Sequence, residues 1–147
     1  MRFSTRSRYG VRMMAFLAGA RGSEPVLLRQ VAKSESISEK YLSQIVIPLR
    51  SAGLLRSVRG ARGGYVLARH PSRITVREIV EVLEGGLDLA DEARGKGALY
   101  PTATARVVED LWRTAREAIC RTLGEITLEE LGRRVAESDQ SPMMYNI

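Results

Sequence analysis

Apolar side chains recur every three or four residues along most of the chain, which is the spacing of helices that each bury one face. The first helix is expected from about residue 4 to residue 20, with a stop at Gly22. A second, shorter helix is expected over residues 26–33. Their inward-facing side chains are predicted to be Tyr9, Met13, Phe16, Leu17, Ala20, Leu27, Leu28, Val31 and Ala32.

The third helix is expected to end at Gly53, and two serines compete for its start. Either Ser36 or Ser38 can cap it, and Ser36 with Glu39 has the spacing of a capping box. Pro48 lies inside this helix, and its missing N–H predicts a bend or a break. The buried side chains are predicted to be Tyr41, Leu42, Ile45, Val46 and Leu49.

Two short β-prone runs follow, at residues 54–58 and 65–67, joined by a loop rich in glycine and arginine. This pattern predicts a two-stranded hairpin. After it, Thr75 and Glu78 have the capping-box spacing and predict a helix over residues 76–84. Gly85 and Gly86 stop that helix.

Residues 85–100 show no period and are expected to form a mobile connection. A long helix then begins near Pro101 or Thr102 and runs for about 20 residues, too long for a domain of this size to cover. Thr127 with Glu130 predicts a last short helix over residues 128–137. The apolar stripe of the long helix carries Val108, Leu111, Trp112, Ala115, Ile119, Leu123 and Ile126.

Three helices followed by a two-stranded hairpin are the order of a winged helix-turn-helix. The fold class is therefore expected to be mainly α with a small β-hairpin. Residues 1–84 are expected to form the winged helix-turn-helix domain, residues 85–137 a linker and further helices, and residues 138–147 a C-terminal tail.

Charge divides the chain into two halves. Residues 1–73 carry 14 Lys and Arg against 3 Asp and Glu, a net charge of +11, whereas residues 74–147 carry 9 against 14, a net charge of −5. A cationic half is typical of a protein that binds a polyanion such as nucleic acid. The alternative is a solvated surface that is merely rich in arginine.

The third helix has the short polar and cationic side chains that reading a major groove needs. Gln44 can form a bidentate contact to adenine, and Ser38 or Lys40 can reach a phosphate or a guanine edge. An ordinary exposed helix face explains the same pattern when the helix is taken alone. The predicted DNA contacts in this helix are Ser38, Glu39, Lys40, Tyr41 and Gln44, with Ser43 extending the polar face.

The hairpin loop suits the wing of such a domain. Loops that cradle nucleotide phosphates lead into a helix, whereas Gly63 and Gly64 lead into a strand. An arginine on a pliable tip can enter a narrow minor groove. A turn that only needs positive φ explains the glycines and leaves the arginines unexplained. The predicted DNA contacts in the wing are Arg59, Gly60, Arg62, Gly63 and Gly64.

Nothing in the sequence forms a recognisable catalytic constellation, so an enzyme is not expected. His70 is interpreted as a surface residue, and Glu78, Glu81 and Glu84 as a solvated helix face. One cysteine, Cys120, cannot by itself hold zinc or an iron–sulfur cluster, so no metal or cofactor is expected. The chain shows neither a secretory signal nor a membrane-spanning run, and a cytoplasmic location is expected.

Four segments carry a family resemblance in order and spacing: MRFSTRSRYGVRMMAFLA, ISEKYLSQIVIPLRSAGLLRSVRGARGGYVLA, ITVREIVEVLEGG and ITLEEL. They resemble the winged-helix regulators of the Rrf2 family over nearly the whole chain. The resemblance implies a transcription repressor that binds a palindromic operator in double-stranded DNA through the third helix and the wing. It also implies a homodimer whose long C-terminal helices cross as dimerisation helices. Ser43 departs from the acidic residue common at that position in the family.

Many members of this family hold an iron–sulfur cluster through three cysteines between the fourth helix and the long one, where this chain has none. That absence resembles the CymR-like branch, which controls cysteine and sulfur metabolism. The tail residues Tyr145, Asn146 and Ile147 are similar to the termini of that branch. Since cysteine synthase accepts such isoleucine tails in its active-site cleft, it is the expected partner. The alternative is a tail packed on its own dimer.

Two other functions stay open. Cys120 lies near Arg113 and Arg116 on the long helix, where cations favour the thiolate, so the chain could be a redox or stress regulator. A lone helical cysteine is, however, more often inert. The alternative from a different class is an RNA-binding or scaffold protein, which should bind structured RNA as well as duplex DNA.

Overall fold

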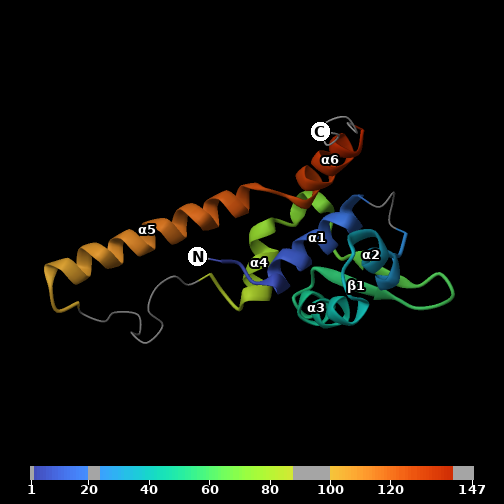
Figure 1. Cartoon of the computed structure of the whole chain (residues 1–147), viewed down its shortest axis with the longest axis horizontal. Coiled ribbons are helices and arrows are strands. Elements are labelled where there is room, and N and C mark those ends of the chain that lie inside the picture. Colours follow the sequence, from blue (N-terminus) through green and yellow to red (C-terminus); the bar gives the residue numbers. More distant parts are fainter. Residues whose placement is uncertain (1, 20–23, 88–99, 141–147) are drawn as a thin grey trace.

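The structure, a computed structural model, describes residues 2–19, 24–87 and 100–140. In this part of the chain a body of helices carries a two-stranded antiparallel hairpin, and one long helix extends from it (Figure 1). The elements are α1 (Thr5–Gly19), α2 (Leu28–Glu35), α3 (Glu39–Ser51), β1 (Leu55–Val58), β2 (Gly64–Leu67), the 3-10 helix η1 (Pro71–Arg73), α4 (Val76–Glu84), α5 (Ala103–Glu125) and α6 (Leu128–Asp139). None of the described helices is long and apolar enough to span a membrane.

Hydroxyl side chains start five of the described helices, because each accepts a hydrogen bond from the backbone N–H three residues later. The capping residues are Ser4, Ser38, Thr75, Thr102 and Thr127. The predicted capping box of Thr75 is confirmed, since the Glu78 carboxylate accepts a hydrogen bond from the Thr75 N–H at 3.0 Å. The predicted box of Ser36 with Glu39 is wrong. Ser36 ends α2 in a left-handed conformation with a φ of 54°, which leaves Ser38 to cap α3.

The core forms around α1, which contacts α2, α3, α4 and α6. Gly10 lets α1 and α4 approach closely, because a Cβ at this position would meet the side chain of Leu83. The buried apolar cluster draws on both halves of the chain and comprises Met13, Met14, Leu17, Val31, Ile37, Leu42, Ile45, Val46, Leu49, Leu54, Leu55, Ile74, Ile79, Leu83 and Leu128. The winged helix and the last helix therefore share one core.

The predicted hairpin is confirmed, and a single antiparallel bridge to Val26 adds to it. β1 and β2 pair antiparallel, with Ser57 opposite Tyr65. On the outer side of β2, the Val26 N–H donates to the Tyr65 carbonyl at 3.0 Å, and the Tyr65 N–H donates to the Val26 carbonyl at 2.8 Å. The predicted start of the second helix at Val26 is therefore wrong, because this pairing keeps Val26 extended and α2 begins two residues later.

One further prediction for the helix-turn-helix is wrong, and another is corrected in part. Leu27 precedes the first turn of α2 and is 36% exposed, so it does not join the buried face. Of the bend or break predicted at Pro48, the break is excluded, since α3 continues to Ser51. The position of Pro48 near the helix end limits the loss to its own missing N–H, while Val46 and Leu49 on either side are buried and hold the last turn on the core.

The two halves of α5 have different surroundings. Its C-terminal half packs on α4, and Cys120 is its buried residue. Its N-terminal half extends away from the body (Figure 1), with Val107 69% exposed and Leu111 58% exposed. α6 then returns to α1 and places Leu128 in the core. The expectation that the long helix exceeds what the body can cover is confirmed.

Some predictions fall outside the described residues. They concern Ala20, Gly22, positions 88–99 of the connection, and the tail residues Tyr145, Asn146 and Ile147. The division of the chain into residues 1–84, 85–137 and 138–147 stays a prediction.

Candidate nucleic-acid interface

The polar face of α3 lies on the outside of the body. Lys40, Ser43 and Gln44 are exposed, and Ser38 and Glu39 are exposed at the helix start. The Ser43 hydroxyl donates to the Glu39 carbonyl at 2.9 Å, so the Ser43 oxygen is left to accept a hydrogen bond. The side chains predicted to read base edges thus share one accessible surface, as a helix in a major groove requires.

Tyr41 connects α3 to α1 and is half-buried, which corrects the prediction of a buried residue. Its ring meets the Tyr9 ring edge-on, with centroids 5.6 Å apart and planes at 85°. The Arg12 guanidinium lies 5.6 Å from the Tyr9 ring centroid and pairs with Glu35 at 2.9 Å. Because aromatic and cation–π contacts are directional, this chain of contacts orients α3 on α1.

A groove of about 430 Å³ separates the start of α3 from α1. Its lining is rich in hydroxyl groups and consists of Thr5, Tyr9, Ser36, Ile37, Ser38, Lys40, Tyr41 and Gln44. Hydroxyls and amines are the groups that proteins direct at DNA phosphates. Thr5 and Tyr9 were missed as candidate contacts, since Tyr9 was assigned to the apolar face. The polar tip of its otherwise apolar side chain is the signal that could have placed it here.

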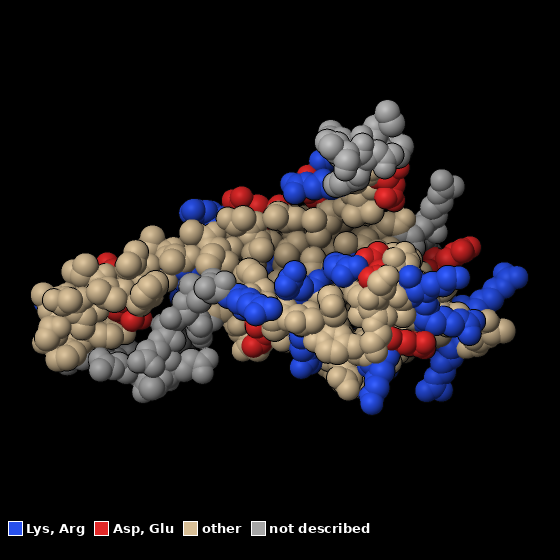
Figure 2. Space-filling model, viewed as in Figure 1, with Lys and Arg blue, Asp and Glu red and all other residues tan. Residues whose placement is uncertain are grey.

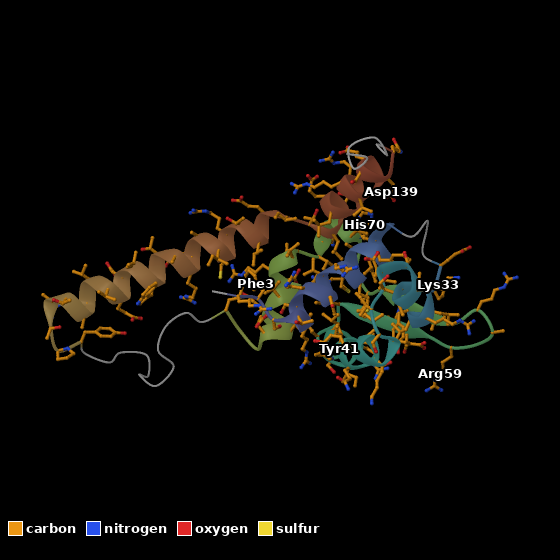
Figure 3. The ribbon with its side chains drawn as sticks, in the orientation of Figure 1. Phe3, Lys33, Tyr41, Arg59, His70 and Asp139 are labelled. Atoms are coloured by element: carbon orange, nitrogen blue, oxygen red, sulfur yellow. The ribbon has the colours of Figure 1, made fainter. Side chains whose placement is uncertain are left out.

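The hairpin carries its two arginines at the tip, where Arg59 and Arg62 are exposed. The Gly63 N–H donates to the Gly60 carbonyl at 3.0 Å and closes the turn. Gly60 has a φ of 110°, a conformation that favours glycine. Arg59 points away from the helices (Figure 3). The tip therefore presents cations on a narrow backbone, which is the shape a minor groove admits.

The basic side chains of the two halves differ in their partners. Up to Arg73, only Arg12 and Arg69 form ion pairs among the described residues. The described cations of this half without an ion pair to another described residue are Arg2, Arg6, Arg8, Arg29, Lys33, Lys40, Arg50, Arg56, Arg59, Arg62 and Arg73. In the second half, the helices pair Arg77, Arg113, Arg133 and Arg134 with acids of the same helix.

Seven of these unpaired cations belong to α2, α3 and the hairpin, where Figure 2 shows Lys and Arg side chains projecting from the surface. The other four are Arg2, Arg6, Arg8 and Arg73, which lie in or before α1 and in η1. A phosphate backbone supplies the counter-charges that the fold itself does not provide, and releases condensed ions when it binds. The surface formed by α3 and the hairpin is therefore a candidate nucleic-acid interface.

Glu84 of α4 has a structural role. It accepts hydrogen bonds from the Ser4 N–H at 2.8 Å and the Ser4 hydroxyl at 2.7 Å, which fixes the start of α1 to the end of α4. Hydrogen bonds from the hydroxyls of Ser7 and Ser4 lower the pKa of Glu84 below its ordinary value. The carboxylate is therefore a cap for α1 and not part of a solvated face.

The other two carboxylates of α4 are also engaged. Burial raises the pKa of Glu78, but hydrogen bonds from the Thr75 N–H and from Arg69 outweigh that effect and the net shift is downward. Glu81 pairs with Arg77 at 2.7 Å. The predicted solvated face therefore holds for Glu78 and Glu81, whose side chains stay partly exposed in surface ion pairs, and is corrected for Glu84.

Cys120 and His70 lie in separate parts of the described structure, on α5 and at the start of η1. Cys120 is 8% exposed, at the end of α5 that packs on α4. His70 lies on the surface as predicted, and its Nδ1 accepts the Ser72 N–H at 3.2 Å at the start of η1. Arg113, which was expected to act on Cys120, pairs with Asp110 and Glu117 on its own helix.

Comparison with known proteins gives relatives over almost the full length. The chain is similar to the transcriptional regulator CymR of Bacillus subtilis (strain 168), with 38% identity over 99% of each chain. It is similar to IscR of Xenorhabdus nematophila, with 37% identity over 89% of this chain and 79% of that one. The solved structure of CymR, the global cysteine regulator of B. subtilis, has a TM-score of 0.78 and 39% identity, covering 91% of this chain and 98% of that one. The structure of T. potens IscR has a TM-score of 0.75 and 34% identity, covering 97% and 92%.

The Rrf2 family, described as an iron-dependent transcriptional regulator, matches residues 3–134. The ligand set for a resident iron does not fit here. The sequence holds one cysteine and one histidine, and the described residues form no group of three or more His, Cys, Asp or Glu that could hold a metal ion. The family match, the relatives and the winged-helix fold agree with one another, and the chain belongs to the Rrf2 family of transcriptional regulators.

Proposed function

We propose that the chain acts as a homodimer that represses transcription by binding a palindromic operator in duplex DNA. The observation that carries this proposal is the pairing of α3, with its exposed polar face, and an arginine-tipped hairpin on a surface whose cations have no ion partner among the described residues. A helix and a hairpin of this kind can occupy adjacent grooves of one duplex.

The candidate residues of α3 and the wing are assigned different contacts with DNA. Gln44 reads adenine, Ser38 and Lys40 reach a phosphate or a guanine edge, and Glu39 accepts from a cytosine amino group. Tyr41 contacts the backbone from the groove beside α1. In the wing, Arg59 and Arg62 enter the minor groove, while the three glycines, Gly60, Gly63 and Gly64, let the backbone approach the sugar-phosphate wall.

The dimer contact is assigned to the uncovered half of α5. Four large apolar side chains are exposed there: Val107 at 69%, Val108 at 41%, Leu111 at 58% and Trp112 at 47%. Their spacing of one and four residues places them on one face, which a second α5 can cover in a two-fold crossing. Two copies related in this way present half-sites about one helical turn apart.

Competition binding at several salt concentrations tests the DNA proposal. The operator is first selected from random duplexes with the full chain, and duplex and structured RNA then compete for the protein. Specific DNA binding should persist at salt concentrations where non-specific phosphate contacts have weakened. Equal competition by structured RNA would instead support the RNA-binding alternative.

Substitution of one wing arginine tests the proposed contacts. Arg59→Ala should cost about 1 to 3 kcal/mol of specific binding. Arg73→Ala is the matched control, because Arg73 is also exposed and has no ion pair with a described residue, but lies in η1 outside α3 and the hairpin. Equal losses for the two variants would argue against a role for the wing.

We further propose that the regulated genes serve cysteine or sulfur metabolism, with cysteine synthase as a partner. Similarity to CymR over 99% of both chains supports this assignment. The proposed contact residues are Tyr145, Asn146 and Ile147, which lie outside the described residues. Deletion of Ile147 should abolish association with purified cysteine synthase, and unchanged association would reject the partner.

Redox sensing through Cys120 is the alternative within the same class. The burial of Cys120 at 8% exposure and the engagement of Arg113 by acids of its own helix both weaken it. Alkylation of the native protein separates the two proposals. If DNA binding survives complete modification of the thiol, the redox alternative is removed.

A further inference from the structure

One apolar side chain interrupts the polar face of α3. Ile47 is 58% exposed, which is unusual for a large aliphatic residue on a helix that packs its other face on the core. Its neighbours three and four positions away along the helix are exposed polar or charged residues: Ser43, Gln44, Arg50 and Ser51. Ile47 therefore belongs to the surface assigned to DNA and not to the core.

The dimer contact proposed on α5 does not include Ile47. The exposed apolar residues assigned to dimerisation, such as Leu111 and Trp112, lie together on α5. Ile47 instead lies on α3, flanked by the unpaired cations Lys40 and Arg50. A positively charged surface with one exposed apolar side chain is suited to a polyanion that also presents an apolar group.

The spacing along α3 matches a helix that reads a major groove. Lys40, Ser43, Gln44 and Ile47 stand at positions i, i+3, i+4 and i+7, the same spacing as the four major-groove positions of a homeodomain recognition helix. At 1.5 Å per residue, the stretch from Lys40 to Ile47 is about 10.5 Å long. This length corresponds to about three base-pair steps of 3.4 Å.

Only one apolar group is offered by base edges in the major groove, and it is the C5 methyl of thymine. We propose that Ile47 is a specificity-determining residue that packs on a thymine methyl in each half-site. On α3, Ile47 lies about one turn of the protein helix from Gln44, which contacts adenine. Ser43 is a poorer partner for the thymine methyl, because its short side chain ends in a polar hydroxyl, which donates to the Glu39 carbonyl. The proposal rests on the proposed function and adds the chemical identity of one base to it.

The test replaces thymine by deoxyuridine, one position at a time, in the operator selected with the full chain. This change removes the methyl group and keeps every hydrogen-bonding group of the base. The wild-type chain should lose about three- to fivefold in affinity at one thymine per half-site, the effect of one buried methyl group. Ile47→Ser should bind the thymine operator more weakly by a similar factor and should show no further loss at that position.

Ile47→Leu is the matched control, since it keeps an aliphatic side chain and should keep the sensitivity to deoxyuridine. Deoxyuridine in the sequence flanking the operator should change nothing for any variant. Urea unfolding followed by circular dichroism checks that Ile47→Ser is folded, and its binding to non-specific DNA at low salt should equal that of the wild type, because that binding depends on the cations.

Three results would overturn the inference: a half-site without thymine, a wild-type chain insensitive at every thymine, or equal sensitivity of the wild type and Ile47→Ser. Each of these results would reject the thymine contact of Ile47 and would leave the proposal of specific DNA binding unaffected. If Ile47→Ser instead lost self-association with an unchanged base preference, Ile47 would be a protein contact. Failure to select any operator would reject the proposed function itself.

Discussion

Substitution of Gly64 by alanine should break the contact between β2 of the wing and Val26. Gly64 has a φ of 149°, and a Cβ there would lie 2.6 Å from the carbonyl oxygen and 2.7 Å from the carbonyl carbon of Val26. These are backbone atoms, which cannot rotate away as the end of a side chain can. Gly64→Ala must therefore push Val26 off the edge of β2.

Two costs set the size of the effect. A non-glycine residue in this region of φ costs about 1 to 3 kcal/mol. Displacing Val26 also breaks its two hydrogen bonds with Tyr65, at 3.0 and 2.8 Å, each worth about 0.5 to 1.5 kcal/mol net. Since breaking the pairing relieves part of the strain, Gly64→Ala should lower the free energy of unfolding by about 2 to 4 kcal/mol.

Gly60→Ala is the control, because Gly60 also has a positive φ of 110° but a Cβ there meets no atom within 4 Å. It should show the strain alone, about 1 to 3 kcal/mol. Urea unfolding followed by circular dichroism gives both free energies, and amide hydrogen exchange reports the Tyr65 N–H. In Gly64→Ala that amide should lose protection and specific DNA affinity should fall. Equal destabilisation of the two variants, with the Tyr65 amide still protected, would refute the reasoning.

Three further predictions concern the core, the dimer and pH. Leu128→Ala should lower the free energy of unfolding by about 2 to 5 kcal/mol in urea, because Leu128 is fully buried between α6 and the winged helix; a loss confined to α6 would contradict the shared core. Leu111→Glu should turn the proposed dimer into a monomer in sedimentation experiments and weaken operator binding at least about tenfold, with monomer unfolding unchanged; a dimer that survives would place the interface elsewhere. Hydrogen bonds from Ser7 and Ser4 hold the pKa of Glu84 below its ordinary value of about 4.5, so its stabilisation is present above that pH and is lost as the pH falls through the folded-state pKa. Urea unfolding should therefore become easier below about pH 4.5, and Glu84→Gln should show a smaller change, whereas identical profiles would deny the cap a role.

Elements with a local signal could be predicted from the sequence. Thr75 and Thr127 each precede an amphipathic run by one residue and have a glutamate three positions later, so the starts of α4 and α6 need no tertiary information. The hairpin is predictable because glycines separate two β-prone runs. The basic surface is predictable because charge is a property of composition as well as of structure.

Errors occurred where a distant contact decides the local conformation. Val26 continues the apolar spacing of α2, yet its backbone pairs with Tyr65, 39 residues away along the chain. Ser36 and Ser38 are both good capping residues, and the left-handed backbone at Ser36 decides that Ser38 caps α3. Gly10 looks neutral in the sequence, because the side chain that requires it comes from α4.

Part of the candidate site can likewise be predicted from the sequence. Polar residues of α3 and arginines of the hairpin are visible in the sequence, and the structure leaves both sets exposed. Ile47 was not singled out, because an isoleucine in a helix is ordinarily counted with the core. Its exposure depends on which face of α3 packs inward, and the buried side chains Leu42, Ile45 and Leu49 settle that in the fold.

The central claim is that two copies of the chain each insert α3 and the wing into one duplex at a separation fixed by α5. The most direct measurement is the affinity for the selected operator before and after five base pairs are inserted between its half-sites. Half a helical turn moves one half-site to the opposite side of the duplex, so the account predicts that affinity falls to the level of a single half-site. Undiminished affinity for the lengthened operator would contradict it.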